Sequence, residues 1–251
     1  RILVADPIDS SGIQRLSESG HIVDVLTGKS EAELSSVIAG YDAMIVRSET
    51  KVTAKLIGWA TKLQVIGRAG VGVDNIDIDA ATSSGIAVVN APTGNTVAAA
   101  EHAFALMMSL ARNIPQADAS VRRGEWSRSK FTGVELRNKT LGVVGLGKVG
   151  SEVARRALAF QMNVLAFDPF VAQDHAKSMG VDVVPMETLL RNSDFISIHT
   201  PLTASTKSLI GQAEFKKLKD GVRIINAARG GLVDEELLDK ALQSGKVAGA
   251  A

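Results

Sequence analysis

Short apolar segments alternate with amphipathic segments along the first part of the chain. The apolar segments have the length of buried strands, and apolar residues recur at helical spacing between them. The predicted strands are 2–5, 21–26, 43–46, 64–67 and 86–90, and the predicted helices lie around 13–16, 31–39 and 54–60. Strands that alternate with helices in this way predict a parallel sheet covered by helices.

The pattern changes at residues 91–95, where Pro92 and Gly94 interrupt both helix and strand. A long apolar helix over 96–112 and a second helix from Pro115 to Arg122 follow. We therefore predict two domains, residues 1–92 and 93–251, which are joined by a hinge.

A second series of strands and helices begins after this helical region. Its predicted strands are 139–144, 163–167, 181–183, 195–198, 222–225 and a segment that starts at 246, and its helices are 151–160, 186–191, 212–218 and 234–244. The fold class predicted for the whole chain is α/β, with two doubly wound parallel-sheet domains, the second of the Rossmann type.

A glycine-rich turn, residues 145–150, lies between the first strand and the first helix of this second series. Gly145 suits a tight turn, Gly147 leaves room for a pyrophosphate, and Gly150 lets the helix approach the strand. The next strand ends at Asp168, whose carboxylate can accept the ribose hydroxyls and would repel a 2′-phosphate. The pattern predicts a dinucleotide site that prefers NAD to NADP; the alternative is a glycine-rich turn in an ordinary βαβ unit.

Other polar residues follow predicted strands, at the sheet edge where α/β proteins bind ligands. Arg47 and Arg68 end two strands of the first domain, and the forked guanidinium suits a phosphate or a carboxylate. The alternative is a pair of surface salt bridges. In the second domain, Ala227 and Ala228 would let a flat ring approach the backbone, and Arg229 would lie beside that ring.

Thr200 also follows a strand, and its hydroxyl is placed to touch the cofactor. Oxidation of an alcohol by hydride transfer needs a base, and histidine is the usual one. Of the four histidines only His199 ends a strand, which makes it an outside candidate. No group of residues has the spacing of a metal site.

Composition narrows the class of protein only slightly. The chain has 251 residues, 45% of them hydrophobic, a net charge of +1 and no cysteine. A charge so close to zero gives no reason to expect binding to nucleic acid or to a membrane surface. The lack of cysteine agrees with a reducing compartment, so we expect a cytoplasmic location, with the plastid stroma as the second location considered.

Taken together, these motifs resemble those of the D-isomer-specific 2-hydroxyacid dehydrogenases along essentially the whole chain. The segments that carry the resemblance are 45–48, 67–75, 90–95, 145–150 and 221–235. The last is specific to the superfamily, and the arginine segments with Gly94 and Asn95 point to the branch that acts on 3-phosphoglycerate.

The resemblance implies a role for each matching residue. Arg229 would be the catalytic arginine that holds the substrate carboxylate and carbonyl. The substrate would also be bound by Arg47, Ser48, Arg68, Gly70, Val71 and Asn95. The cofactor, NAD, would be contacted by Val71, Gly145, Gly147, Lys148, Val149, Gly150, Asp168, Thr200, Ala227, Ala228 and Arg229.

The implied reaction is the NAD-dependent oxidation of 3-phosphoglycerate to 3-phosphohydroxypyruvate, the first step of L-serine biosynthesis, by a homodimer or homotetramer paired through its nucleotide domains. The alternatives are a glyoxylate or hydroxypyruvate reductase and a non-catalytic NAD-sensing protein. In the family, the acid–histidine pair, the closing strands and the returning helix lie beyond the segment that matches residue 251. We therefore expect residues 1–251 alone to have little or no activity.

Overall fold

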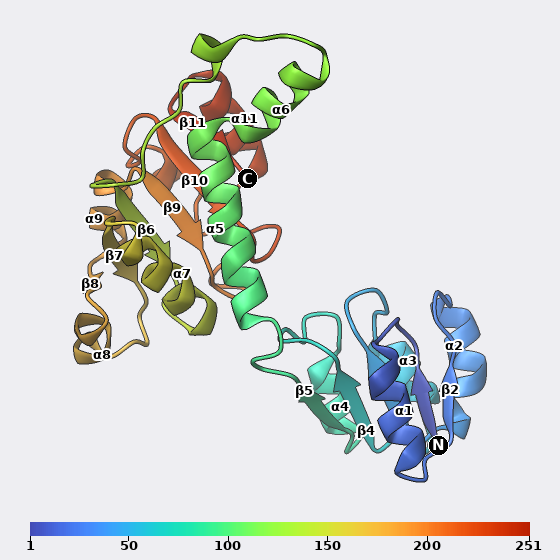
Figure 1. The fold of residues 1–251 in the computed structure, drawn as a ribbon. Coiled ribbons are helices and arrows are strands. Elements are labelled where there is room, and N and C mark those ends of the chain that lie inside the picture. The colour runs from blue at the N-terminus through green and yellow to red at the C-terminus, as the bar shows by residue number, and fades with distance from the viewer. The chain divides into compact units, whose positions relative to one another are not determined.

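The computed structural model describes residues 1–251, and the chain forms two compact units, Arg1–Asn95 and Thr96–Ala251. Each unit is built around one sheet in which every strand pair is parallel (Figure 1). None of the helices combines the length and apolarity needed to cross a lipid bilayer.

The first unit has a five-stranded sheet in the order β2-β1-β3-β4-β5. The strands are β1 (Ile2–Val4), β2 (Val23–Val25), β3 (Ala43–Val46), β4 (Val65–Arg68) and β5 (Ala87–Asn90). The helices are α1 (Ser10–Glu18), α2 (Glu31–Val37), α3 (Ala54–Trp59) and α4 (Ile78–Ser83), with a 3-10 turn η1 (Ile38–Gly40) after α2.

The helices of the first unit begin where the sequence supplies a capping side chain. Asp9, Ser30, Thr53 and Asp77 each accept a hydrogen bond from a backbone N–H in the first turn of the helix that follows. Apolar residues of α2, α3 and α4 then pack on one face of the sheet, against residues such as Met44 on β3. Each of these three short helices is therefore stabilised both by its N-cap and by burial of its apolar face on the sheet.

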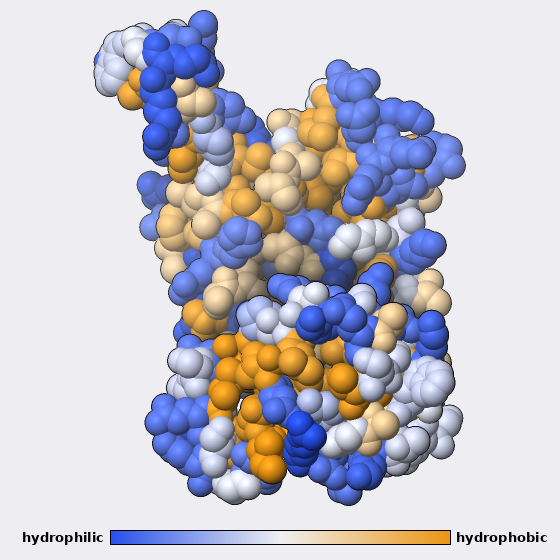
Figure 2. Space-filling model, turned by 90° about the vertical axis from the view of Figure 1, so that its right-hand side faces the viewer, coloured by the Kyte–Doolittle hydropathy of each residue, from blue (hydrophilic) through white to orange (hydrophobic).

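Other hydrophobic residues of the first unit remain at its surface. Figure 2 shows a hydrophobic patch on this unit, in the lower half of the view. Among the large side chains, Ile22, Val25, Val37, Trp59, Ile78 and Val89 are exposed. Val25 belongs to one edge strand and Val89 to the other. The edges of this sheet are therefore covered less completely than its centre.

The second unit has a six-stranded sheet in the order β11-β10-β9-β6-β7-β8. Its strands are β6 (Thr140–Val144), β7 (Asn163–Phe167), β8 (Asp182–Val183), β9 (Phe195–Ile198), β10 (Val222–Asn226) and β11 (Val247–Ala250). Its helices are α5 (Thr96–Arg112), α6 (Ile114–Arg122), α7 (Lys148–Ala159), α8 (Gln173–Ser178), α9 (Met186–Asn192), α10 (Gln212–Phe215) and α11 (Glu235–Gln243), with a 3-10 turn η2 (Arg128–Phe131).

This strand order is that of the Rossmann fold: the second and third strands are added on one side of the first strand, and after a reversal the later strands are added on its other side. Here the reversal lies between β6 and β9, which are hydrogen-bonded neighbours. The prediction of an α/β chain with a Rossmann-type second domain is confirmed.

Two apolar cores lie on the two faces of the second sheet. Helices α5 and α7 pack together on one face, where Phe104 and Met107 of α5 and Val153 of α7 are buried. Helix α9 packs on the other face, and it comes so close to β6 that a β-carbon on Gly142 would overlap the side chain of Leu189. The sheet is therefore enclosed on both faces, as parallel sheets require.

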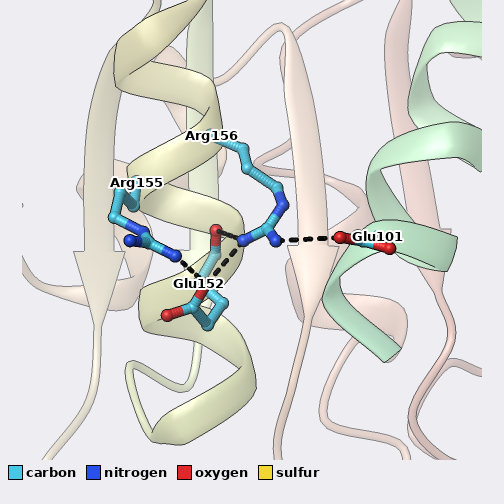
Figure 3. Close-up of polar contacts among 4 residues, drawn as sticks. All are labelled: Glu101, Glu152, Arg155 and Arg156. Atoms are coloured by element: carbon cyan, nitrogen blue, oxygen red, sulfur yellow. Dashed lines mark hydrogen bonds and ion pairs between the residues drawn. The ribbon is translucent and has the colours of Figure 1, made fainter. Parts of the chain in front are cut away.

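A small ion-pair network joins α5 to α7 at the surface (Figure 3). Arg156 of α7 donates to Glu152 one turn earlier and also reaches Glu101 of α5, with a nitrogen–oxygen distance of 3.2 Å. Arg155 donates to the same carboxylate of Glu152. The network supplements the apolar contact between the two helices.

Some predicted elements differ from the structure. Helix α4 was not predicted, because residues 78–83 span fewer than two helical turns and contain only three apolar residues, Ile78, Ala80 and Ala81. The helix predicted over 212–218 ends at Phe215, and that predicted over 31–39 passes into the 3-10 turn η1 after Val37. In each case the element is too short for periodicity to define its ends.

Candidate functional site

The glycine turn of the second unit has the geometry that its sequence predicts. Gly145 follows β6 with φ of +92°, a left-handed conformation that favours glycine. A β-carbon on Gly145 would lie 2.8 Å from the carbonyl oxygen of His199, so the turn also needs glycine for close approach to β9. A β-carbon on Gly150 would overlap the carbonyl of Gly145. Both residues therefore let α7 begin directly above the strand.

Gly147 has a different role from the other two glycines. A β-carbon there would meet no atom within 4 Å, and Gly147 is the N-cap of the twelve-residue helix α7. Because it has no side-chain oxygen, no capping group covers this helix end. Lys148 and Val149 form the first turn, and Val149 packs on the core. The open space above a helix N-terminus is where a phosphate group is stabilised by the backbone N–H groups and the helix dipole.

Asp168 lies beside this turn, directly after β7. Its Oδ2 accepts the backbone N–H of Leu146 and its Oδ1 accepts that of Phe170, each at 2.8 Å. The carboxylate is therefore held at the turn by one N–H from either side. Each oxygen retains a second lone pair, which leaves the group able to accept two hydroxyls.

The end of β9 places two further residues at the same edge. The Oγ1 atom of Thr200 is buried and has no hydrogen-bond partner, and Thr200 lies next to Gly145. A buried hydroxyl without a partner is costly and therefore indicates a place where a bound group completes the hydrogen bonding.

His199 is largely enclosed, and its Nε2 lies 2.8 Å from the Oγ of Ser197. Burial lowers the pKa of its imidazole to about 4. An imidazole with so low a pKa is a weak proton acceptor near neutral pH, which disfavours His199 as a catalytic base.

The segment after β10 carries the third part of this edge. The side-chain amide of Asn226 donates to the carbonyl of Arg229 at 2.8 Å and accepts the N–H of Ala228 at 3.2 Å. The guanidinium of Arg229 donates to the carbonyl of Ala228 at 2.8 Å. Asn226 thus shapes the turn that presents Ala227, Ala228 and Arg229, a role that the sequence analysis missed.

Strand register explains why these residues meet. Val144 of β6 pairs with Phe167 of β7 and with Ile198 of β9, and Ile198 pairs with Asn226 of β10. The residues that follow these four strands therefore lie along one carboxyl edge, at the reversal point of the sheet. They include all the predicted cofactor contacts of the second unit: Gly145, Gly147, Lys148, Val149, Gly150, Asp168, Thr200, Ala227, Ala228 and Arg229.

The first unit brings a second set of predicted residues together in the same way. Val46 of β3 pairs with Arg68 of β4, which pairs with Asn90 of β5. Arg47 and Ser48, which follow Val46, are exposed at this edge. They lie beside Arg68, whose Nε donates to the carbonyl of Arg47 at 3.1 Å.

The guanidinium of Arg68 lies over Gly70, where a β-carbon would overlap it. The carbonyl of Val71 accepts the side-chain amide of Asn90 at 2.6 Å. Asn95, the last residue of this unit, is exposed. Glycine at position 70 therefore leaves room for the arginine at the edge of the sheet.

Comparison with known proteins agrees with this architecture. Residues 104–251 match the family model described as "D-isomer specific 2-hydroxyacid dehydrogenase, NAD binding domain". The whole chain is 56% identical to D-3-phosphoglycerate dehydrogenase of Archaeoglobus fulgidus and 51% identical to that of Bacillus subtilis, and it covers 48% and 47% of those proteins. The chain thus spans about half the length of the curated relatives it matches.

Solved structures of similar fold match the chain along its whole length. The TT0316 protein of Thermus thermophilus is 35% identical with a TM-score of 0.91, and the match covers 100% of this chain and 80% of that one. D-lactate dehydrogenase of Aquifex aeolicus, solved with NAD and lactic acid, is 32% identical with a TM-score of 0.88, and the match covers 100% of this chain and 75% of that one. The chain therefore belongs to the D-isomer-specific 2-hydroxyacid dehydrogenases, and residues 104–251 are its NAD-binding domain.

Proposed function

We propose that the protein oxidises 3-phosphoglycerate to 3-phosphohydroxypyruvate with NAD, the first step of L-serine biosynthesis. The observation that carries the proposal is the pair of arginines, Arg47 and Arg68, which lie together at the carboxyl edge of the first sheet. Two guanidinium groups suit a substrate that has both a carboxylate and a phosphate. The relatives that match the whole chain and bear the name D-3-phosphoglycerate dehydrogenase support this substrate.

The residues of the second unit fit NAD. The open space at Gly147 suits the pyrophosphate, the carboxylate of Asp168 suits the two ribose hydroxyls, and the partnerless hydroxyl of Thr200 is available to the nicotinamide half. A carboxylate at position 168 would repel the 2′-phosphate of NADP. When bound, NAD supplies an acceptor for the hydride that leaves C2 of the substrate.

The protein residues bind and orient the substrate in this proposal. Arg47, Ser48 and Arg68 hold its anionic groups, with Gly70, Val71 and Asn95 around them. Arg229 is the catalytic arginine, because a fixed positive charge stabilises both the carboxylate and the negative charge that develops on the C2 oxygen. The hydroxyl proton passes to a base other than His199, since the pKa of that buried imidazole is about 4.

Three further assignments rest on the same proposal. Residues 1–92 form the substrate-binding domain and residues 93–251 the NAD-binding domain. The protein pairs as a homodimer or homotetramer through the nucleotide domain, where α5 retains half-buried Leu106, Met108 and Leu110 after packing on the core. We place it in the cytoplasm. Size-exclusion chromatography with light scattering tests the assembly.

The activity is tested by NADH oxidation with the full-length protein, comparing phosphohydroxypyruvate with hydroxypyruvate. We expect kcat/KM to be at least about tenfold higher for the phosphorylated substrate, because a phosphate contact at a guanidinium contributes that much or more. The ratio of kcat/KM for phosphohydroxypyruvate to that for hydroxypyruvate should fall in Arg47→Ala or Arg68→Ala. It should stay unchanged in the matched control Arg15→Ala, since Arg15 is an exposed arginine on α1.

Equal or reversed preference would favour a glyoxylate or hydroxypyruvate reductase. That alternative is supported by the structural match to a glyoxylate reductase of Paecilomyes thermophila, with 34% identity, a TM-score of 0.90 and coverage of 99% of this chain and 79% of that one. Binding of NADH without turnover of any 2-oxo acid would favour a non-catalytic NAD-sensing protein.

A further inference from the structure

The loop that follows β3, residues 47–50, carries two of the proposed substrate-binding residues and belongs to neither helix nor strand. A loop without regular hydrogen bonding holds a side chain in place only when other groups bind its backbone. Asp6, directly after β1, supplies this binding and is only 1% exposed.

The carboxylate of Asp6 binds the donors of this loop. Its Oδ2 accepts the N–H of Arg47 at 2.6 Å, and its Oδ1 accepts both the N–H of Thr50 at 3.0 Å and the hydroxyl of Thr50. The N–H of Glu49 points to the same carboxylate at 3.3 Å. One buried side chain from a distant part of the chain therefore holds both ends of the loop.

Neighbouring side chains bind the acceptors of the same loop. The side-chain amide of Asn75 donates to the carbonyl of Arg47 at 3.0 Å and to that of Thr50 at 2.7 Å. Arg68 donates to the carbonyl of Arg47 as well. Both polar groups of the Arg47 backbone are thus held by side chains, and the position of its Cα follows from residues that are far away in the sequence.

A carboxylate is suited to this task because it offers only acceptors. Burial of its charge is unfavourable unless several hydrogen-bond donors surround it, and here backbone N–H groups and a hydroxyl provide them. An amide in its place would turn an NH₂ group toward N–H donors and disturb the loop. The sequence therefore places a buried carboxyl group at a position where an apolar residue would otherwise be expected.

We propose that Asp6 is a positioning residue for the substrate: through the backbone of residues 47–50, it sets Arg47 and Ser48 in the arrangement that binds the anionic groups. This inference rests on the proposed function. Asp6 acts on the first unit alone, so its replacement should weaken binding of the substrate and leave binding of NADH to the second unit unchanged.

The test uses the full-length protein and steady-state NADH oxidation with phosphohydroxypyruvate. For Asp6→Asn we expect KM for phosphohydroxypyruvate to rise at least tenfold, while the Kd for NADH, measured by fluorescence titration, stays within twofold. Asp9→Asn is the matched control, since Asp9 is a nearby exposed carboxylate that caps α1 and does not contact the loop. It should leave both constants unchanged.

A second pair of variants covers the case in which Asp6→Asn does not fold. Thr50→Val removes the hydroxyl that donates to Asp6, and Thr50→Ser restores it. We expect KM for phosphohydroxypyruvate to rise severalfold in the valine variant and to return in the serine variant, with an unchanged Kd for NADH.

The results separate this inference from the proposed function. An active wild-type protein whose KM stays within twofold in Asp6→Asn and in Thr50→Val would overturn the role of Asp6 alone. An equal rise in the Kd for NADH, or a KM that the serine variant does not restore, would also overturn it. A wild-type protein that fails to oxidise NADH with any of the 2-oxo acids tested would overturn both proposals.

Discussion

The buried imidazole of His199 makes the stability of the second unit depend on pH. Its pKa is lowered by burial from the ordinary value of 6.5 to about 4, so the folded protein takes up the proton far less readily than the unfolded chain. The stability that depends on a neutral His199 is fully present above pH 6.5. It is lost as the pH falls from 6.5 toward 4, because protonation of the imidazole then favours the unfolded chain.

The size of the effect follows from the two pKa values. A difference of about 2.5 units corresponds to about 3 kcal/mol once both states are protonated, at about 1.4 kcal/mol per unit. At pH 5 the unfolded imidazole is almost fully protonated and the folded one is about one-tenth protonated, so about 2 kcal/mol is lost relative to pH 8.

Urea unfolding followed by far-UV circular dichroism measures this loss. Wild type and His199→Gln are compared between pH 8 and pH 5, because glutamine is neutral throughout and other titrating groups cancel in the difference. The wild-type free energy of unfolding should fall by about 2 kcal/mol more than that of the variant. Parallel pH dependence of the two proteins would refute the assignment of a buried, neutral imidazole.

The lower pH limit of the experiment is set by carboxylates. Ion pairs and hydrogen bonds lower the pKa of Glu33 and of Glu125 to about 2, with the backbone N–H of Ser30 as the main cause for the first and Arg123 for the second. Stabilisation from these groups is lost only as the pH falls below their ordinary value of 4.5. Between pH 5 and 6.5 these two carboxylates therefore add little to the pH dependence of stability.

Four further substitutions test the second unit. Gly150→Ala should lower the melting temperature and weaken NADH binding at least tenfold, because its β-carbon would overlap the Gly145 carbonyl, whereas Gly147→Ala should weaken binding with little effect on melting. Asp168→Ala should reduce the ratio of NADPH to NADH Kd, measured by fluorescence titration, toward one; an unchanged ratio would contradict its role. Glu152→Gln should lower the melting temperature slightly, and the difference from wild type should shrink in high salt.

The geometry of the glycine turn in the second unit was predictable because its signals are local. The turn 145–150, the strand before it and Asp168 lie within about thirty residues, and each glycine has a requirement that can be stated from its position alone. The structure adds the reason for Gly145, since the carbonyl of His199, directly after β9, blocks any larger residue. Only that contact required knowledge of which strands are neighbours.

The carboxyl edge of the first sheet was predictable only in part. Arg47 and Arg68 stand out as charged residues at strand ends, but the residues that hold them do not. Asp6 contacts the loop across 41 to 44 positions of sequence, and Asn75 does so across 25 to 28. Periodicity and motifs report on neighbours in the sequence, so contacts of this range depend on strand order.

The backbone of Arg47 and the side chain of Thr200 differ in how their polar groups are satisfied, and this bears on how each proposed site would respond to a ligand. The backbone N–H of Arg47 is engaged by Asp6 and its carbonyl by Asn75, which indicates that this residue is set before a ligand arrives. At the second edge, the buried hydroxyl of Thr200 has no partner. The hydroxyl of Thr200 is already removed from water in the folded protein, so a ligand that binds it gains a hydrogen bond without a further desolvation cost for this group. We therefore expect this one hydroxyl to contribute measurably to the affinity for the cofactor. Thr200→Val, which keeps the shape and removes the hydroxyl, should therefore stabilise the protein without ligand and weaken NADH binding severalfold. A variant that gained no stability and bound NADH as tightly as wild type would contradict this account of the site.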